Sequence, residues 1–135
     1  MPVGTKVVLH IEDNFENLIL IRRLLQFNGY QVIEADSVFK AVSILKKYRP
    51  DLILMDINLP DIDGNTLTSK LKSIPYFKNI PIVAITANAL KGDRERSMQA
   101  GYDGYIEKPI DVDLFPKQIE HYLNGKNGQE FDIFS

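Results

Sequence analysis

The segment Leu52-Ile53-Leu54-Met55-Asp56 decides the fold of this chain, because four apolar residues in a row end in a carboxylate. A strand without polar alternation is buried on both faces, as a central strand of a parallel sheet is. In open α/β sheets, ligands bind outside the carboxyl ends of such strands. The segment therefore predicts a buried parallel strand that presents Asp56 at the ligand-binding edge of the sheet.

Short β-branched segments alternate with segments of helical period on both sides of this strand. This alternation is typical of a doubly wound α/β fold, in which helices cover both faces of a parallel sheet. Five strand and helix pairs can be counted. The expected strands are Val7–Ile11, Gln31–Ala35, Leu52–Met55, Ile82–Ile85 and Gly104–Ile106.

Apolar residues spaced three and four apart predict a helix after each strand. The first helix ends at Asn28-Gly29, the third carries Leu67, Leu71 and Ile74, and the fourth runs to about Ala100-Gly101. The inner stripe of the second helix, which Pro50 ends, is expected to be Val38, Ala41, Val42, Leu45 and Tyr48. The last helix is expected to begin from an Asp111 cap.

Composition excludes several classes of function. The chain has 135 residues, 16 Lys and Arg against 18 Asp and Glu, a net charge of −2 and no cysteine. This length corresponds to one domain. The nearly balanced charge gives no basic surface to attract the phosphates of nucleic acid. Without cysteine, disulfides and thiolate zinc sites are excluded. No apolar run approaches the length of a membrane span, so we expect a soluble, cytoplasmic protein.

Polar residues stand at the ends of four of the expected strands: Glu12 and Asp13, Asp56, Thr86, and Lys108 just before a proline. Carboxylates that converge at one edge repel one another unless a cation compensates them. Hard oxygen ligands without His or Cys suit Mg²⁺. Thr86 and Lys108 supply a hydroxyl donor and a positive charge for an anion beside the metal, and a carboxylate such as Asp56 can attack a phosphoryl group.

These motifs together resemble the CheY-like receiver domain of two-component response regulators. The resemblance rests on four segments in order: His10 to Asn14, Leu54 to Gly64, Ile85 to Ala87, and Tyr105 to Ile110. It covers about Lys6 to Asn124 and implies a flavodoxin-like (βα)5 fold with strand order 2-1-3-4-5. It also implies a stand-alone response regulator of bacterial phosphorelay signalling.

The resemblance assigns roles to individual residues. Asp56 matches the phosphoacceptor, and Glu12, Asp13, Asp56 and the backbone carbonyl of Asn58 match the Mg²⁺ ligands. Thr86 and Lys108 match the residues that hold the phosphoryl oxygens, and Thr86 with Tyr105 matches the conformational switch. The modulating positions are Ala87, Asn88 and Pro109, and Asn58 also stands at a position that biases autodephosphorylation.

The implied function is acceptance of a phosphoryl group from the phosphohistidine of a sensor kinase or phosphotransfer protein. The signal then leaves through contacts with a downstream protein, with no nucleic acid and no membrane as partner. Catalysis would be limited to the protein's own phosphorylation and slow dephosphorylation. Two alternatives stay open: a receiver-like interaction module that never carries phosphate, and the receiver fragment of a hybrid histidine kinase.

Three competing patterns involve the same acidic residues. Asp13 with Glu16 is also a fair capping box for the first helix. The segment 61–65 resembles the D-x-D-G-T signature of aspartate-nucleophile phosphatases, but it lies five residues beyond the strand end. As a calcium loop with Gly64 at position six it fails, because Leu59 and Lys70 stand where carboxylates are required.

Residues 125–135 form a tail with no counterpart in the family. Phe131, Ile133 and Phe134 are too few to build a core, and Gly125 and Gly128 loosen their connection to the last helix. We therefore predict a receiver domain over residues 1–124 and a disordered tail. The alternative is that the tail docks on an apolar patch or on a partner. The role of His10, where an apolar residue is commoner, is not indicated by the pattern.

Overall fold

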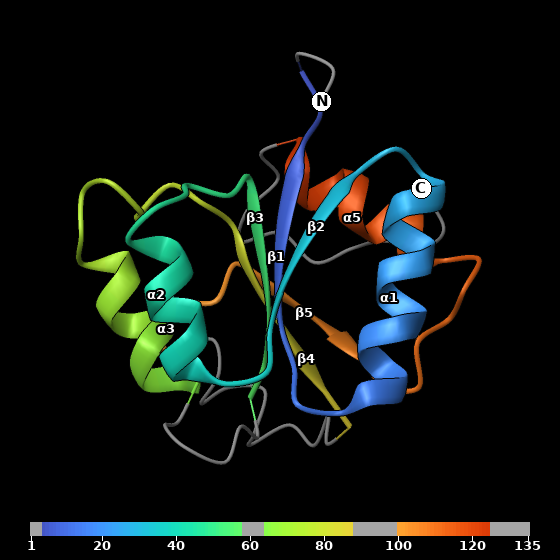
Figure 1. Ribbon diagram of the computed structural model, residues 1–135, viewed down its shortest axis with the longest axis horizontal. Helices are drawn as coiled ribbons and strands as arrows, with labels where there is room; N and C mark the ends of the chain where they lie inside the picture. The colour runs from blue at the N-terminus through green and yellow to red at the C-terminus, as the bar shows by residue number, and fades with distance from the viewer. Residues whose placement is uncertain (1–3, 58–63, 88–99, 125–135) are drawn as a thin grey trace.

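The computed structural model of the chain describes residues 4–57, 64–87 and 100–124 (Figure 1). Five parallel strands form one sheet in the order β2-β1-β3-β4-β5. The strands are β1 (Val7–Ile11), β2 (Gln31–Ala35), β3 (Leu52–Asp56), β4 (Ile82–Thr86) and β5 (Gly104–Glu107). The predicted strand order is confirmed, and each predicted strand differs from the observed one by no more than one residue at its end.

Helices cover both faces of the sheet. The described helices are α1 (Phe15–Phe27), α2 (Val38–Leu45), α3 (Gly64–Lys72) and α5 (Phe115–Leu123). Figure 1 shows α1 and α5 on one side of the sheet and α2 and α3 on the other. The predicted fourth helix lies mostly outside the described residues. None of the helices in the described ranges has the length and apolar composition that a membrane crossing requires.

Two apolar clusters, one on each face, hold the helices against the sheet. On the α2 and α3 side, Leu9, Ile53 and Met55 pack with Leu67 and other buried residues. On the α1 and α5 side, Val8 and Leu54 pack with Ile21, Ile119 and Phe115. All five residues of β3 are buried, as the sequence predicts for the central strand.

Two helix boundaries differ from the prediction. The second helix ends at Leu45, so that Tyr48 lies outside it and is 60% exposed instead of facing the core. Pro50 disfavours helical backbone at the residue before it, and the chain must turn into β3 within a few residues. Similarly, Ile74 lies in the turns that follow α3.

Asp111 caps a turn and not the last helix itself. Its Oδ1 accepts hydrogen bonds from the backbone nitrogens of Asp113 and Leu114, at 3.0 and 3.1 Å. The N-cap of α5 is Leu114, which makes no side-chain capping bond. Asp111 therefore shapes the turn that leads into α5.

Candidate functional site

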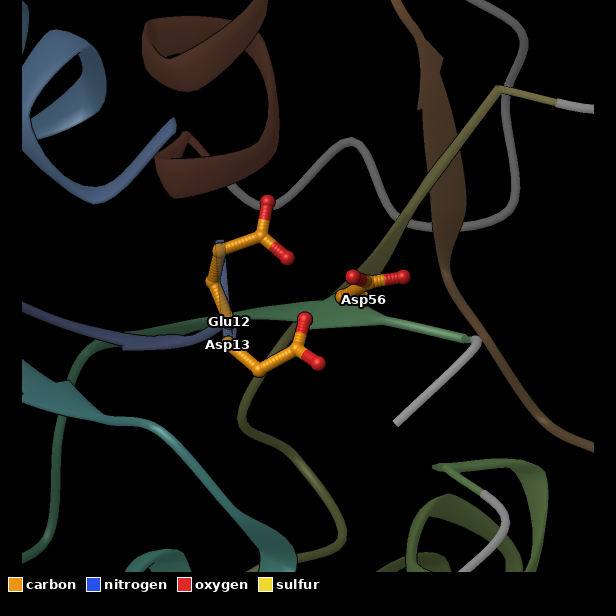
Figure 2. Close-up of side chains that lie close together, drawn as sticks. All are labelled: Glu12, Asp13 and Asp56. Atoms are coloured by element: carbon orange, nitrogen blue, oxygen red, sulfur yellow. The ribbon is translucent and has the colours of Figure 1, made fainter. Parts of the chain in front are cut away.

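Three carboxylates from two strand ends meet at one edge of the sheet. Glu12 and Asp13 follow β1, and Asp56 ends β3; each offers one oxygen, and these oxygens all lie within 4.8 Å of one another (Figure 2). Glu12 and Asp56 are buried, with 0% and 5% of their surface exposed, whereas Asp13 is exposed. Two buried acids and one exposed acid thus face the same small space.

The sheet register brings these residues together. β1 and β3 pair in parallel with Ile11 opposite Met55, so the residues that follow each of them are also neighbours. The backbone nitrogen of Glu12 donates to the carbonyl oxygen of Ala35 at 2.9 Å, which ties the end of β1 to the end of β2. The position of the acids therefore follows from strand pairing and not from a flexible loop.

Lys108 brings a cation to the same place from beyond β5. Its ammonium nitrogen lies 3.2 Å from Glu12 Oε1 and 3.5 Å from Asp56 Oδ2. The Lys108 backbone nitrogen donates to the carbonyl oxygen of Thr86 at 2.8 Å, which anchors this segment to the end of β4. One ammonium group consequently bridges two buried carboxylates that come from different strands.

The electrostatics of the site favour an additional cation. Burial and the neighbouring Asp56 carboxylate raise the pKa of Glu12 to about 7, while Lys108 acts in the opposite direction. Most of this rise in pKa comes from burial, and the smaller part that comes from the Asp56 carboxylate is the part that a bound cation would offset. Carboxylate oxygens with one side open to solvent at Asp13 are a donor set that fits Mg²⁺, which binds through carboxylates and keeps several waters. The residues present therefore fit this ion.

The structure also describes Thr86, Ala87, Tyr105 and Pro109 among the predicted site residues. Thr86 ends β4 and is 4% exposed, and Ala87 beside it is exposed. Tyr105 lies in β5 opposite Ala84, half-buried against the cluster on the α2 and α3 side. Pro109 is exposed, and the Lys108–Pro109 peptide bond is cis. Asn58 and Asn88 lie outside the described residues.

The capping alternative for Asp13 is wrong. The N-cap of α1 is Asn14, whose side-chain oxygen accepts a hydrogen bond from the Asn17 backbone nitrogen at 2.9 Å. Asp13 and Asn14 are adjacent, and the extended backbone of Asn14 places its side chain in the capping position. Asp13 is thereby left to face Glu12 and Asp56.

His10 is completely buried. It is 0% exposed, and strand alternation places its side chain on the same face of β1 as that of Glu12. Neither ring nitrogen has a hydrogen-bond partner among the described residues. Burial, and secondarily Lys108, lower the pKa of His10 to about 3, so the imidazole is neutral. The single polar residue inside an apolar strand was the signal for this feature, but it did not reveal the burial.

Comparison with known proteins identifies the family to which this site belongs. Residues 8–120 match the response regulator receiver domain. The chain belongs to this family. Receiver domains of this family act in two-component signalling, and this chain is a receiver domain of that kind.

Relatives of the receiver domain include whole response regulators and parts of kinases. The chain is 44% identical over 119 residues to the polar-differentiation response regulator DivK of Brucella ovis, a match that covers 88% of this chain and 97% of that protein. It is 34% identical to the receiver domain of a sensor histidine kinase from Pseudomonas aeruginosa, with a TM-score of 0.82 and coverage of 90% and 99%. That structure holds a magnesium ion coordinated in its active-site cleft. A response regulator from Chloroflexus aurantiacus superposes with a TM-score of 0.85 at 26% identity, again covering 90% and 99%.

Proposed function

We propose that Asp56 of this receiver domain accepts a phosphoryl group from a phosphohistidine on a sensor histidine kinase or phosphotransfer protein, in a Mg²⁺-dependent reaction. The observation that carries the proposal is the meeting of Glu12, Asp13 and Asp56 with the ammonium group of Lys108 at one sheet edge. Phosphoryl transfer depends mainly on positioning and on neutralisation of charge, and this arrangement supplies both.

Glu12, Asp13 and Asp56 would hold the Mg²⁺ ion, and the Asn58 carbonyl is the expected further ligand. When bound, the ion neutralises negative charge on the phosphoryl oxygens. The magnesium ion in the related Pseudomonas aeruginosa receiver domain supports this choice of metal.

In the transfer step, a carboxylate oxygen of Asp56 attacks phosphorus and forms the new oxygen to phosphorus bond. The phosphorus to nitrogen bond of the donor histidine breaks, and its electron pair returns to the imidazole. Lys108 moves from its ion pairs with Glu12 and Asp56 toward a phosphoryl oxygen, and the Thr86 hydroxyl donates to another. Hydrolysis by water later restores the Asp56 carboxylate. By the resemblance to receiver domains, Asn58, Ala87, Asn88 and Pro109 occupy positions that tune the rate of this reaction.

The signal leaves through a shift between two conformations. Phosphorylation gives the Thr86 hydroxyl a new acceptor, and its movement makes room for Tyr105 on the adjacent strand to turn inward. A modification shifts such an equilibrium only by its different interaction with the two states. Residues 1–124 form the unit that carries this function, and a downstream protein reads the changed surface.

The test is phosphorylation by acetyl phosphate with Mg²⁺, measured by intact-protein mass. One phosphoryl group should be added to the wild-type protein, and none to Asp56→Asn or in the presence of a chelator. Asp36→Asn is the matched control, because Asp36 is an exposed carboxylate that pairs with Lys40. Continued phosphorylation of Asp56→Asn would contradict the proposal, and failure of wild-type labelling would favour the interaction module that never carries phosphate.

A further inference from the structure

A groove opens between α2 and α3, on the face of the sheet away from α1 and α5. Its volume is about 420 Å³. Val42 and Leu45 of α2 form one wall and Leu67 and Leu71 of α3 form the other, with Phe77 from the turn after α3 at the end. Leu45, Leu67 and Leu71 are only 4–6% exposed, whereas Val42 and Phe77 are half-buried, so most of the apolar surface that these five residues leave open to solvent comes from Val42 and Phe77.

The rim of this α2–α3 groove is basic. Lys46 and Lys70 line it, and both are exposed. The Arg49 guanidinium lies 5.6 Å from the ring centroid of Tyr76, another lining residue, and its Nε donates to the Tyr76 carbonyl oxygen at 3.0 Å. No described residue that lines the groove is acidic, although the whole chain carries a net charge of −2. The groove therefore suits an apolar segment that carries negative charge.

The C-terminal residues of this chain have that chemistry. Residues 130–134 read Glu-Phe-Asp-Ile-Phe, which is three large apolar side chains and two carboxylates in five residues. By themselves these residues cannot bury their apolar surface, which is the reason for expecting disorder in an isolated tail. The groove offers the apolar surface and the positive charge that the segment lacks.

The geometry of the fold allows the tail to reach the groove. Because all strands are parallel, each helix returns the chain to the edge where the strands begin, and α2, α3 and α5 all end at this edge (Figure 1). The groove is lined by the second half of α2, by Leu67, Lys70 and Leu71 of α3, and by the turn after α3, so most of it lies toward the same edge. Six residues separate Asn124 from Phe131, and the seven Cα–Cα steps between them span roughly 23–25 Å when the chain is extended. The end of α5 and the groove therefore lie at the same edge of the sheet, on opposite faces.

We infer that residues 130–134 of this chain dock in the α2–α3 groove of the same molecule. The aromatic rings of Phe131 and Phe134 and the Ile133 side chain cover the apolar walls, and Glu130 and Asp132 pair with the basic rim. This contact is separate from the phosphorylation edge and does not depend on the proposed phosphoryl chemistry.

A spin label on the full-length chain tests the inference directly. The sequence has no cysteine, so Ser135→Cys gives a single attachment site. With the label oxidised, the methyl signals of Leu67 and Leu71 should lose intensity relative to the reduced sample. The methyl signals of Ile21 and Leu25, which are buried on the α1 and α5 side, should keep theirs. Equal intensity at Leu67 and Leu71 in the two samples would overturn the inference.

Mixed samples separate docking within one molecule from docking between copies. Isotope-labelled protein without a spin label, mixed with spin-labelled protein without isotopes, should show no loss at Leu67 or Leu71. Loss in this mixture that matches the loss in the single-species sample would mean that the tail of a second copy fills the groove, and the inference would be wrong.

Charge reversal tests the assignment of the rim. Lys70→Glu and Asp132→Lys should each reduce the loss of intensity at Leu67, and the double variant should recover part of it. Lys40→Glu is the matched control, because Lys40 is an exposed lysine of α2 that pairs with Asp36 and does not line the groove. Single variants that behave like wild type would contradict the role of the charges, and retained thermal unfolding temperatures would show that the variants fold.

Discussion

The ammonium nitrogen of Lys108 lies 3.2 Å from a carboxylate oxygen of Glu12 that is buried from solvent. The two residues are far apart in the sequence and follow β5 and β1, which are not neighbours in the sheet. The same ammonium lies 3.5 Å from Asp56 Oδ2. In the proposed reaction, a metal ion held by these carboxylates would compete with this ammonium group, which would then be free to pair with a phosphoryl oxygen.

The affinity for Mg²⁺ is expected to fall as the pH is lowered. Burial and the Asp56 carboxylate raise the pKa of Glu12 to about 7, and the protonated acid is a poor ligand. For one titrating ligand with this pKa, the affinity at pH 6 is about ten-fold weaker than at pH 8. Calorimetric titration with Mg²⁺ at both pH values measures this ratio. Glu12→Gln should bind more weakly at pH 8 and show a flatter pH profile, and a profile as steep as that of wild type would assign the titration to another group.

Asp13 and Asn14 should respond differently to alanine substitution. Asn14→Ala removes the capping hydrogen bond to Asn17 and should lower the free energy of unfolding by about 1 kcal/mol. Asp13→Ala relieves repulsion among the carboxylates, so the metal-free variant should be no less stable than wild type, although its Mg²⁺ affinity should fall. Urea unfolding in the presence of a chelator compares them. A loss of stability in Asp13→Ala as large as that in Asn14→Ala would contradict this assignment.

The buried imidazole of His10 should make the protein less stable in mild acid. Its pKa is about 3 in the folded state against 6.5 in the unfolded chain, so protons bind the unfolded state more strongly once the pH falls below 6.5. The contribution of His10 to stability is complete above pH 6.5 and should decrease by about 2 kcal/mol between pH 7 and pH 5. Because Glu12 titrates in the opposite sense, the test is the difference between wild type and His10→Val in metal-free urea unfolding. That difference should shift in favour of the variant as the pH falls, and parallel pH profiles would refute the prediction.

Gly104 should be intolerant of any side chain. A Cβ atom at this position would overlap the ring and hydroxyl of Tyr122, which is 2% exposed and packs from α5 onto β5. Gly104→Ala should therefore cost about 1–3 kcal/mol of stability through displacement of Tyr122. Gly29→Ala is the comparison, because a Cβ there meets nothing within 4 Å and the cost arises only from the positive φ of 86°. Chemical shifts of the α5 amides should change in Gly104→Ala and not in Gly29→Ala; an unmoved α5 would show that the strand yields instead.

Thr86→Ala should separate phosphorylation from signalling. The proposed role of the Thr86 hydroxyl is to follow the phosphoryl group, and its loss leaves Asp56 and Lys108 in place. We expect the variant to be phosphorylated by acetyl phosphate but to show smaller ring shifts at Tyr105 than wild type. NMR of the beryllofluoride-treated proteins provides the comparison, with Thr66→Ala on the exposed side of α3 as the control. Tyr105 shifts of equal size in wild type and Thr86→Ala would exclude this coupling.

Much of the fold was predictable because it depends on short-range pattern. Alternating apolar segments delimit β1 and β2 at the residues where the structure has them, and the continuous apolar run of Leu52–Met55 identifies the central strand. Parallel strands end at a common edge, so the convergence of Glu12, Asp13 and Asp56 also follows from the order of the strands. The residue roles that were assigned by resemblance remain proposals.

The sequence by itself therefore determined the strands, the layers and the edge at which the acidic residues meet. Only the tertiary structure decided that Lys108 bridges Glu12 and Asp56, that His10 is completely buried, and that Asn14 and not Asp13 caps α1. It also showed that Tyr48 is exposed and not part of the core, and that a groove lies between α2 and α3. The physical reason is that periodicity reports which face of an element is apolar. Side-chain reach, the backbone conformation of one capping residue and the spacing between two packed helices arise from contacts between segments that are distant in the chain.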